Sequence, residues 1–229
     1  MRDPAPDLRV VVARLGEAHG TPEPPLAREP FAAVVWENVG YLVDDERRRQ
    51  VFERLRDQVG ITPEALLAVA EDDLAALIAD GGMLPAHRAA KVQKAAAIAA
   101  EIGADELRRQ AAAGTGGRLL RRFPGIGEPG ADRLLLLAGG KRTLAPDSNA
   151  LRVLLRLGFG SDSGGYAAQY RSAAAAVAPQ LPDDGEWLLG AHQLLRRHGQ
   201  EICKRSAPRC EACPLTPTCA WYAARARRR

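Results

Sequence analysis

Apolar residues recur every three or four positions along most of the chain, which is the spacing of one face of an α-helix. Segments predicted to be helical on this pattern include 8–19, 85–102 and 166–177. Capping residues and prolines mark further helix starts, such as Thr62-Pro63 before a segment that reaches residue 70. No segment of useful length alternates with a period of two, and no repeat recurs at a fixed interval. The pattern predicts an all-α protein.

The other helices are expected between turns marked by glycine and proline. The Pro-rich segment 21–30 cannot continue the first helix and is predicted to be a linker. Aromatic residues make up only 5% of the chain, while Ala, Leu and Arg dominate, so an all-β fold is excluded. The further predicted helices are 31–43, 44–59, 62–70, 71–80, 105–113, 117–122, 128–138, 147–157 and 184–198.

Charge is distributed unevenly along the chain, whose formal net charge is +4. Nine basic and two acidic residues follow position 195, giving +7 there and leaving −3 for residues 1–195. A basic segment of this kind suits a polyanionic partner, although a solvated basic tail has the same composition. No apolar run reaches the roughly 20 residues that span a bilayer, and charges interrupt the N-terminal apolar stretch too early for a signal peptide. We therefore expect a soluble cytoplasmic protein with no membrane partner.

All four cysteines lie close together near the C-terminus. Cys203, Cys210, Cys213 and Cys219 have the spacing C-x6-C-x2-C-x5-C. Four thiols in one short segment of an intracellular chain indicate a metal or cluster site, and two disulfides are the alternative. By chemistry alone, four thiolates suit either a zinc ion or an iron–sulfur cluster. Zinc sites more often use two C-x2-C pairs, so the single pair here favours a [4Fe–4S] cluster.

A glycine-containing turn joins two of the predicted helices. Residues 119–127 read LLRRFPGIG, with Gly125 and Gly127 on either side of Ile126. Glycines leave room for a phosphate to approach the backbone N–H groups at the start of the next helix, where the helix dipole favours an anion. Such a turn would bind nucleic acid without reading its sequence. Taken alone, the tetrapeptide Pro-Gly-Ile-Gly is also typical of ordinary helix connections.

Together, the cysteine spacing, the preceding His198-Gly199 and the glycine turn resemble the endonuclease III family of helix-hairpin-helix DNA glycosylases. The resemblance covers most of the chain, from residue 30 to residue 219. It implies a six-helix domain at 28–141 that contains the hairpin, and a domain formed by 1–27 and 142–229 that holds a structural [4Fe–4S] cluster. It also implies DNA contacts by Gly125, Ile126 and Gly127 of the hairpin and by Lys204, Arg205 and Arg209 between the first two cysteines. On composition alone, those three cations are equally consistent with solvated surface charge.

Two acidic residues lie where the family has catalytic carboxylates. Asp147 follows Gly127 by twenty residues, the interval of the family's essential aspartate, although Pro146 replaces the usual aliphatic residue. Without the resemblance, Asp147 is a helix N-cap, and both roles are compatible. Beside a flipped nucleotide, its carboxylate could stabilise positive charge on the sugar or deprotonate a water. Glu37 matches a glutamate of the adenine- and thymine-excising branches. In the adenine branch that residue protonates the purine, which requires a raised pKa, and otherwise Glu37 is a structural glutamate.

Two positions depart from the family pattern. Members that also cut the strand carry a nucleophilic lysine two residues after the second hairpin glycine, where this chain has Pro129, and the nearest lysine is Lys141. The resemblance therefore implies base excision without AP lyase activity. Where many members have a Gln-rich segment that fills the gap left by the flipped base, residues 38–45 read NVGYLVDD. Tyr41 or Leu42 is the candidate wedge, and the change leaves the target base open.

These features predict a monofunctional DNA glycosylase of base excision repair that acts as a nucleoid-associated monomer. Its partner would be double-stranded DNA containing a lesion or mismatch, from which it flips one base and hydrolyses the N-glycosidic bond. Two alternatives remain open. One is a non-catalytic cluster-bearing protein that binds distorted duplexes, which the altered wedge segment motivates. The other is a glycosylase and AP lyase that uses a displaced amine such as Lys141.

Overall fold

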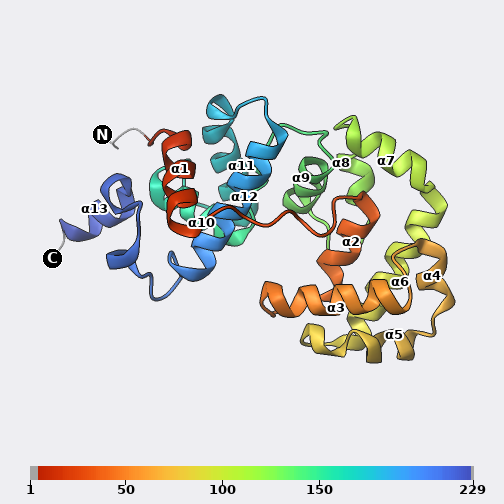
Figure 1. Ribbon diagram of the computed structural model, residues 1–229. Coiled ribbons are helices and arrows are strands. Elements are labelled where there is room, and N and C mark those ends of the chain that lie inside the picture. Colours follow the sequence, from red (N-terminus) through yellow and green to blue (C-terminus); the bar gives the residue numbers. More distant parts are fainter. Residues whose placement is uncertain (1–4, 228–229) are drawn as a thin grey trace. The chain divides into compact units, whose positions relative to one another are not determined.

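The computed structural model describes residues 5–227, which contain α-helices and short 3₁₀-helices but no named strand (Figure 1). The predicted all-α fold class is confirmed. The described residues form two compact units, one from residues 5–24 and 142–227 and the other from Pro25–Lys141. No helix in this described part is long and apolar enough to cross a membrane. Residues 1–4, and Arg228 and Arg229 of the basic C-terminal segment, lie outside the described residues.

The unit Pro25–Lys141 is built around α2 (Pro30–Val39), which contacts α3, α6, α7 and α9. Phe31, Val34, Val35 and Val39 are all at most 4% exposed, as expected for a predominantly apolar helix that is buried among others. The other helices of this unit are α3 (Asp45–Gln58), α4 (Pro63–Ala68), α5 (Glu71–Leu77), the 3₁₀-helix η1 (Ala79–Gly81), α6 (Pro85–Ile102), α7 (Ala104–Ala112), α8 (Gly117–Leu120) and α9 (Glu128–Leu137).

In the other unit, α12 (Gly185–Glu201) packs against α1 (Leu8–His19) and α10 (Ser148–Leu157) (Figure 1). Its core includes Leu8 and Leu15 of α1, which are fully buried. A smaller cluster of Leu151, Tyr170 and Ala173 joins α10 to α11 (Tyr166–Val177). The remaining elements are η2 (Ala178–Gln180), η3 (Cys210–Ala212), η4 (Thr216–Thr218) and α13 (Ala220–Ala226).

Helix α2 ends at Val39, so the predicted helix 31–43 is too long at its C-terminal end. The next residue, Gly40, is extended, and Tyr41 pairs with Gly82 in an isolated parallel bridge. Arg88 of α6 donates a hydrogen bond to the Val39 carbonyl at 2.5 Å. These contacts join segments far apart in the chain, and they outweigh the local preference of the apolar residues after Gly40 for helix.

The C-terminal end contains more helix than the pattern of apolar residues predicts. Helix α12 continues to Glu201 rather than ending at residue 198, and α13 was not expected at all. Helix α13 has only seven residues, too few for a clear hydrophobic period, and Cys219 caps it by accepting a hydrogen bond from the Tyr222 backbone N–H. Its contacts with α10 supply the packing that a helix this short needs.

Arg88 is the one buried arginine among the residues the structure describes, at 3% exposure. Its guanidinium donates to backbone carbonyls at the ends of several elements, which brings the segment after α2 against the segment before α6. Five carbonyl oxygens accept from it, those of Val39, Ile78, Ala79, Gly82 and Met83.

We expect Arg88→Met to lower the free energy of unfolding by at least about 3 kcal/mol, because each buried carbonyl left without a donor costs about 1–3 kcal/mol. The measurement is urea denaturation followed by circular dichroism. Lys94→Met, at an exposed position of the same helix, is the matched control and should change stability by no more than about 0.5 kcal/mol. Equal losses in the two variants would contradict the role given to Arg88.

Candidate functional site

The four cysteine side chains line one apolar cavity, although no group of three or more His, Cys, Asp or Glu side chains in the described residues is arranged to hold a metal ion. We call residues 203–219 the cysteine loop. All four thiols are free and partly buried. A lone zinc ion requires every ligand sulfur at about 2.3 Å. The four thiols therefore line a common cavity but do not have the tight tetrahedral arrangement of ligands around a single zinc ion.

Three of the four cysteine sulfurs have an N–H group or an imidazole nitrogen within hydrogen-bonding distance. Such donors stabilise a thiolate more than a thiol, because the negative charge strengthens the bond. The pairs are Arg156 Nη1 to Cys203 Sγ at 3.3 Å, the Tyr222 backbone N to Cys219 Sγ at 3.4 Å, and His198 Nε2 with Cys213 Sγ at 3.4 Å.

Burial has the opposite effect on these thiols. It raises the pKa of Cys213 to about 11 and also raises the pKa of Cys219 above its ordinary value. At neutral pH these two free thiols are therefore protonated. A positively charged group that binds them must displace the protons, as metal binding to cysteine generally does.

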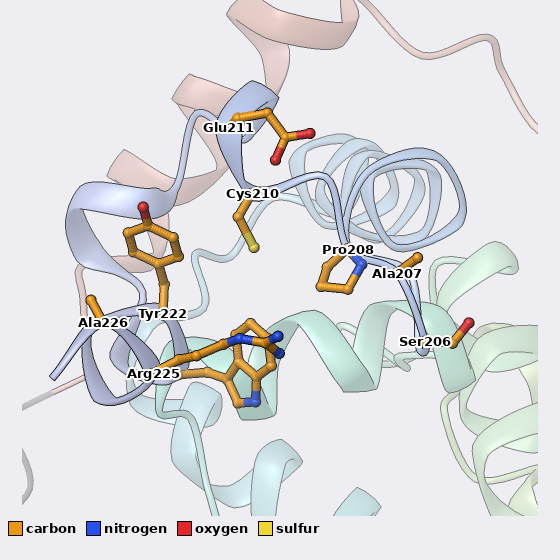
Figure 2. Close-up of a pocket in the computed structure, with 9 residues that line it drawn as sticks. Ser206, Ala207, Pro208, Cys210, Glu211, Tyr222, Arg225 and Ala226 are labelled. Atoms are coloured by element: carbon orange, nitrogen blue, oxygen red, sulfur yellow. The ribbon is translucent and has the colours of Figure 1, made fainter. Parts of the chain in front are cut away.

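A hollow of about 470 Å³ opens beside the cysteine loop and reaches Cys210. Figure 2 shows the Cys210 sulfur pointing into this hollow between the rings of Tyr222 and Pro208. Ser206, Glu211 and Arg225 add polar groups to its lining. Solvent can therefore approach the cysteine cavity from the side of Cys210.

The three cations of the cysteine loop are exposed, and hydrogen bonds hold the backbone on which they lie. Arg156 of α10 donates to the carbonyls of Lys204 at 2.9 Å and Arg205 at 3.1 Å. The backbone N–H of Arg209 donates to the Ile202 carbonyl at 2.9 Å. This arrangement presents three positive charges on an ordered surface loop.

Asp147 is the N-cap of α10 and forms an ion pair with α12. Its Oδ1 accepts from the backbone N–H groups of Asn149 at 2.9 Å and Ala150 at 2.8 Å, and its Oδ2 accepts from Arg196 Nε at 3.0 Å. The preceding Ala145 is fully buried with a φ of 42°, a left-handed conformation that costs free energy for a residue other than glycine. Both oxygens of the Asp147 carboxylate are thus fixed in direction. No local pattern reveals Arg196 as the partner, because it lies 49 residues further along the chain.

Arg152 of α10 connects the turn that holds Asp147 to the cysteine loop. Its guanidinium donates to Asn149 Oδ1 at 2.8 Å, to the Gly199 carbonyl at 2.7 Å and to the Cys203 carbonyl at 2.8 Å. Position 199 must be glycine, because a Cβ there would lie 2.5 Å from the Asn149 carbonyl oxygen. Gly199 of the His198-Gly199 pair thus allows the end of α12 to lie close to Asn149, and Arg152 donates hydrogen bonds to both segments.

Glu37 lies on α2 and is held by Arg133 of α9. Arg133 Nε contacts Oε1 at 3.1 Å and Nη2 contacts Oε2 at 2.6 Å, which is the bidentate geometry of an arginine–carboxylate pair. The two side chains are 20% and 17% exposed, so water screens the pair only partly. In this geometry both carboxylate oxygens of Glu37 are within hydrogen-bonding distance of the Arg133 guanidinium.

The hairpin residues form the turn between α8 and α9, as expected from the sequence. Gly125 has a φ of 76°, which favours glycine, and Ile126 is buried beneath the turn. Asn38 of α2 fixes the turn by donating from Nδ2 to the Pro124 carbonyl at 3.1 Å. Gly127 is the N-cap of α9, and no side chain of the described residues caps that helix start. Pro129 occupies the first turn of α9, where proline is well tolerated.

Tyr41 and Leu42, the candidate wedge, lie on an exposed loop and not on a helix. Leu42 is 75% exposed with a φ of 57°, and Tyr41 is 49% exposed. The bridge between Tyr41 and Gly82 brings a second pair of exposed apolar residues to this loop, Met83 at 58% and Leu84 at 57%. Sequence reasoning missed the second pair. The sequence signal that could have identified this pair is the position of two apolar residues directly after Gly81-Gly82.

Comparison with curated proteins identifies relatives of this chain, although no protein-family model matches it. The chain is 31% identical to a thymine-DNA glycosylase of Aeropyrum pernix over 175 residues, 70% of this chain and 69% of that protein. It is 29% identical to endonuclease III of Treponema pallidum over 162 residues, 70% of each chain. The match to endonuclease III of Rickettsia conorii is 30% identical over 112 residues, and the chain spans only 47% of that relative's length.

Solved structures show the same fold at lower sequence identity. A non-covalent endonuclease III–DNA complex aligns with a TM-score of 0.75 and 23% identity over 96% of this chain and 97% of the other. A thermostable thymine-DNA glycosylase aligns with a TM-score of 0.73 and 19% identity over 95% and 97%. The fold is therefore that of the all-α helix-hairpin-helix glycosylases. With its relatives and its hairpin, the chain belongs to the endonuclease III family of these proteins.

We expect the Glu37–Arg133 pair to stabilise the protein measurably. A double-mutant cycle with Glu37→Gln and Arg133→Met should give a coupling of about 1–2 kcal/mol in the free energy of unfolding, since the pair is bidentate and mostly shielded from water. The exposed pair of Arg122 and Glu101 is the matched control, for which about 0.2–1 kcal/mol is expected. The assignment fails if the two couplings are the same.

Proposed function

We propose that this protein is a monofunctional DNA glycosylase of base excision repair. It would flip a damaged or mismatched base out of duplex DNA and hydrolyse the N-glycosidic bond, leaving an abasic site. The observation that carries the proposal is the Asp147 carboxylate, which two backbone N–H groups and Arg196 hold in one orientation at the start of α10. Because the chain belongs to a family of DNA glycosylases, we assign to that carboxylate a role in cleavage of the N-glycosidic bond.

Asp147 would act on the sugar of the flipped nucleotide. Cleavage of the glycosidic bond develops positive charge on the sugar, and a carboxylate fixed nearby stabilises that charge more than a mobile one does. The same oxygen atoms can orient a water and accept its proton. Arg196 holds one oxygen of the carboxylate in place through its Nε–H, at 3.0 Å.

Glu37 is the second proposed catalytic residue. Because both of its oxygens accept hydrogen bonds from Arg133, the carboxylate can receive an N–H group of the target base or a water. Protonation of a purine would need a proton that this geometry does not hold. The pair therefore favours Glu37 as an acceptor that positions a base or water.

Two observations support hydrolysis without strand cleavage. Pro129, at the position of the family's nucleophilic lysine, has no amine with which to form a Schiff base. Lys141, the nearest lysine in sequence, forms an ion pair with Asp132 of α9. A lyase reaction through Lys141 would have to break this pair and release a neutral amine.

DNA would be held through its backbone and distorted by an apolar wedge. The glycine turn of residues 125–127 offers uncovered backbone at a helix start, and Lys204, Arg205 and Arg209 offer positive charge on an ordered loop. Tyr41 or Leu42 would fill the gap left by the flipped base, with Met83 and Leu84 beside them. None of these groups reads base identity in the duplex, which agrees with a search for lesions rather than for a sequence.

A [4Fe–4S] cluster fits the cysteine loop. Four free thiols line one apolar cavity, and Arg156, the Tyr222 backbone N–H and the His198 imidazole lie within hydrogen-bonding distance of three of the sulfurs. Cys203, Cys210, Cys213 and Cys219 would hold the cluster. When bound, it supplies a rigid cross-link of the loop that carries the three cations, rather than a group that reacts with the base.

We expect Asp147→Asn to reduce base release at least about 100-fold, because general base and charge stabilisation are both lost. Affinity for lesion-containing duplex should change little, since asparagine remains a good N-cap. Release is measured on duplexes with uracil, mismatched thymine, adenine opposite 8-oxoguanine, hypoxanthine or alkylated purines, and cleavage should appear only after alkali treatment.

Asp184→Asn, which alters the equivalent cap of α12, is the matched control and should release bases at the parental rate. Release by Asp147→Asn at that same rate would refute the mechanism. Tight binding by the parental protein without release on any duplex would instead support the non-catalytic alternative, and covalent trapping of DNA by borohydride would support a lyase.

We expect Arg205→Glu or Arg209→Glu to weaken binding similarly for every DNA sequence and to reduce the slope of log affinity against log salt by about 1. Both effects follow from the loss of a phosphate contact that carries no base information. Lys94→Glu, on the exposed face of α6, is the control and should leave the salt slope unchanged. An effect confined to one lesion would show that the cysteine loop reads the base.

A further inference from the structure

One amide side chain of α2 is buried against the glycine turn that joins α8 to α9. Asn38 is 5% exposed, although the other buried residues of this helix are apolar. Its Nδ2 donates to the Val34 carbonyl, one helical turn earlier, at 2.9 Å and to the Pro124 carbonyl of the glycine turn at 3.1 Å. An amide nitrogen has two N–H bonds, so each of them has a backbone acceptor here.

The same amide packs against Gly125. A Cβ on Gly125 would lie 3.1 Å from Asn38 Oδ1, and the φ of 76° at this position already favours glycine. Glu37, the residue directly before Asn38, is held to α9 by Arg133. Consecutive residues of α2 therefore hold the glycine turn and the helix that follows it.

The hydrogen bond from Asn38 fixes the orientation of one peptide group. The bond between Pro124 and Gly125 is trans, and in a planar trans peptide the C=O and N–H groups point in opposite directions. Asn38 holds the C=O towards α2, so the Gly125 N–H points away from α2. The next N–H, that of Ile126, donates to the Phe123 carbonyl at 3.2 Å. The Gly125 N–H donates to no acceptor within residues 5–227, which the structure describes.

We propose that Asn38 is a positioning residue for DNA binding, which directs the Gly125 N–H at a phosphate of the duplex. The inference rests on the proposed function, in which the glycine turn contacts the DNA backbone. A phosphate oxygen is a charged acceptor, and an N–H that already points at it contributes more affinity than one that must first be reoriented. Without the Asn38 amide, the peptide group could rotate without losing a hydrogen bond, and the backbone freedom of glycine would permit the rotation.

The test compares the DNA affinity of Asn38→Leu with that of the parental protein. Leucine is close to asparagine in size but donates no hydrogen bond. Asn38→Leu should weaken the binding of lesion-free duplex about tenfold, the effect of losing one hydrogen bond to a charged group. The slope of log affinity against log salt should stay at the parental value, because the lost donor carries no charge. Parental affinity in Asn38→Leu would overturn the inference.

Gln93→Leu is the matched control for the loss of a side-chain amide. Gln93 of α6 donates from Nε2 to the Val69 carbonyl at 2.6 Å, and so it joins two segments of the same unit as Asn38 does. This variant should lose stability in urea denaturation to a similar extent and keep the parental affinity for duplex. Equal losses of affinity in the two variants would show that Asn38 has a purely structural role, and that result would overturn the inference.

A second measurement does not depend on how well the leucine variant folds. In ¹H–¹⁵N NMR spectra of the parental protein, addition of duplex should move the Gly125 amide proton downfield, because this proton forms a hydrogen bond with a phosphate oxygen. A Gly125 signal that stays in place while the protein is saturated with duplex would overturn the inference.

Base release separates this inference from the proposed function. A parental protein that binds duplex but releases no base would refute the glycosylase activity alone, because the affinity comparison requires no reaction. A parental protein that releases bases, with an Asn38→Leu variant that binds as tightly, would refute only the role of Asn38. A parental protein that binds no duplex would overturn both.

Discussion

The guanidinium of Arg152 is the interaction on which the architecture around Asp147 depends. Its acceptors belong to the Asp147 turn, the end of α12 and the start of the cysteine loop. Because the guanidinium donors are fixed in one plane, none of these segments can shift without losing a hydrogen bond in a partly buried place. The position of the Asp147 carboxylate therefore cannot change independently of the position of the cysteine loop.

The two candidate catalytic carboxylates are held in the same way, each by an arginine on a neighbouring helix. Arg196 reaches Asp147 from α12, and Arg133 reaches Glu37 from α9. Burying a charged group without a partner costs free energy, because its contacts with water are lost. The arginines offset this cost and set the direction of the oxygens. Each unit thus holds one charged hydrogen-bond acceptor at a fixed position near the protein surface.

Local signals in the sequence predict helices and caps well and predict long-range partners poorly. Helices α1, α6 and α11 have the expected bounds, since a glycine follows α1 and α6 directly and Pro179 follows α11 closely, and such residues end a helix. The end of α2 and the whole of α13 were missed, because tertiary contacts determine them. The partner of Glu37 is 96 residues away and that of Asp147 is 49 residues away. Such pairs depend on how the helices pack against one another. The spacing of residues along the chain carries no information about that packing.

Opposing forces act on the sulfurs of the cysteine loop. Burial disfavours a thiolate at Cys213 and Cys219, whereas the nearby donors from α10, α12 and α13 favour it. Without a positive group between them, four thiolates around one cavity would also repel each other. N–H groups aimed at sulfur stabilise the deprotonated form, so they favour the binding of a positively charged group that displaces the thiol protons. The hydrogen bonds around this loop therefore suit deprotonated sulfurs better than protonated ones.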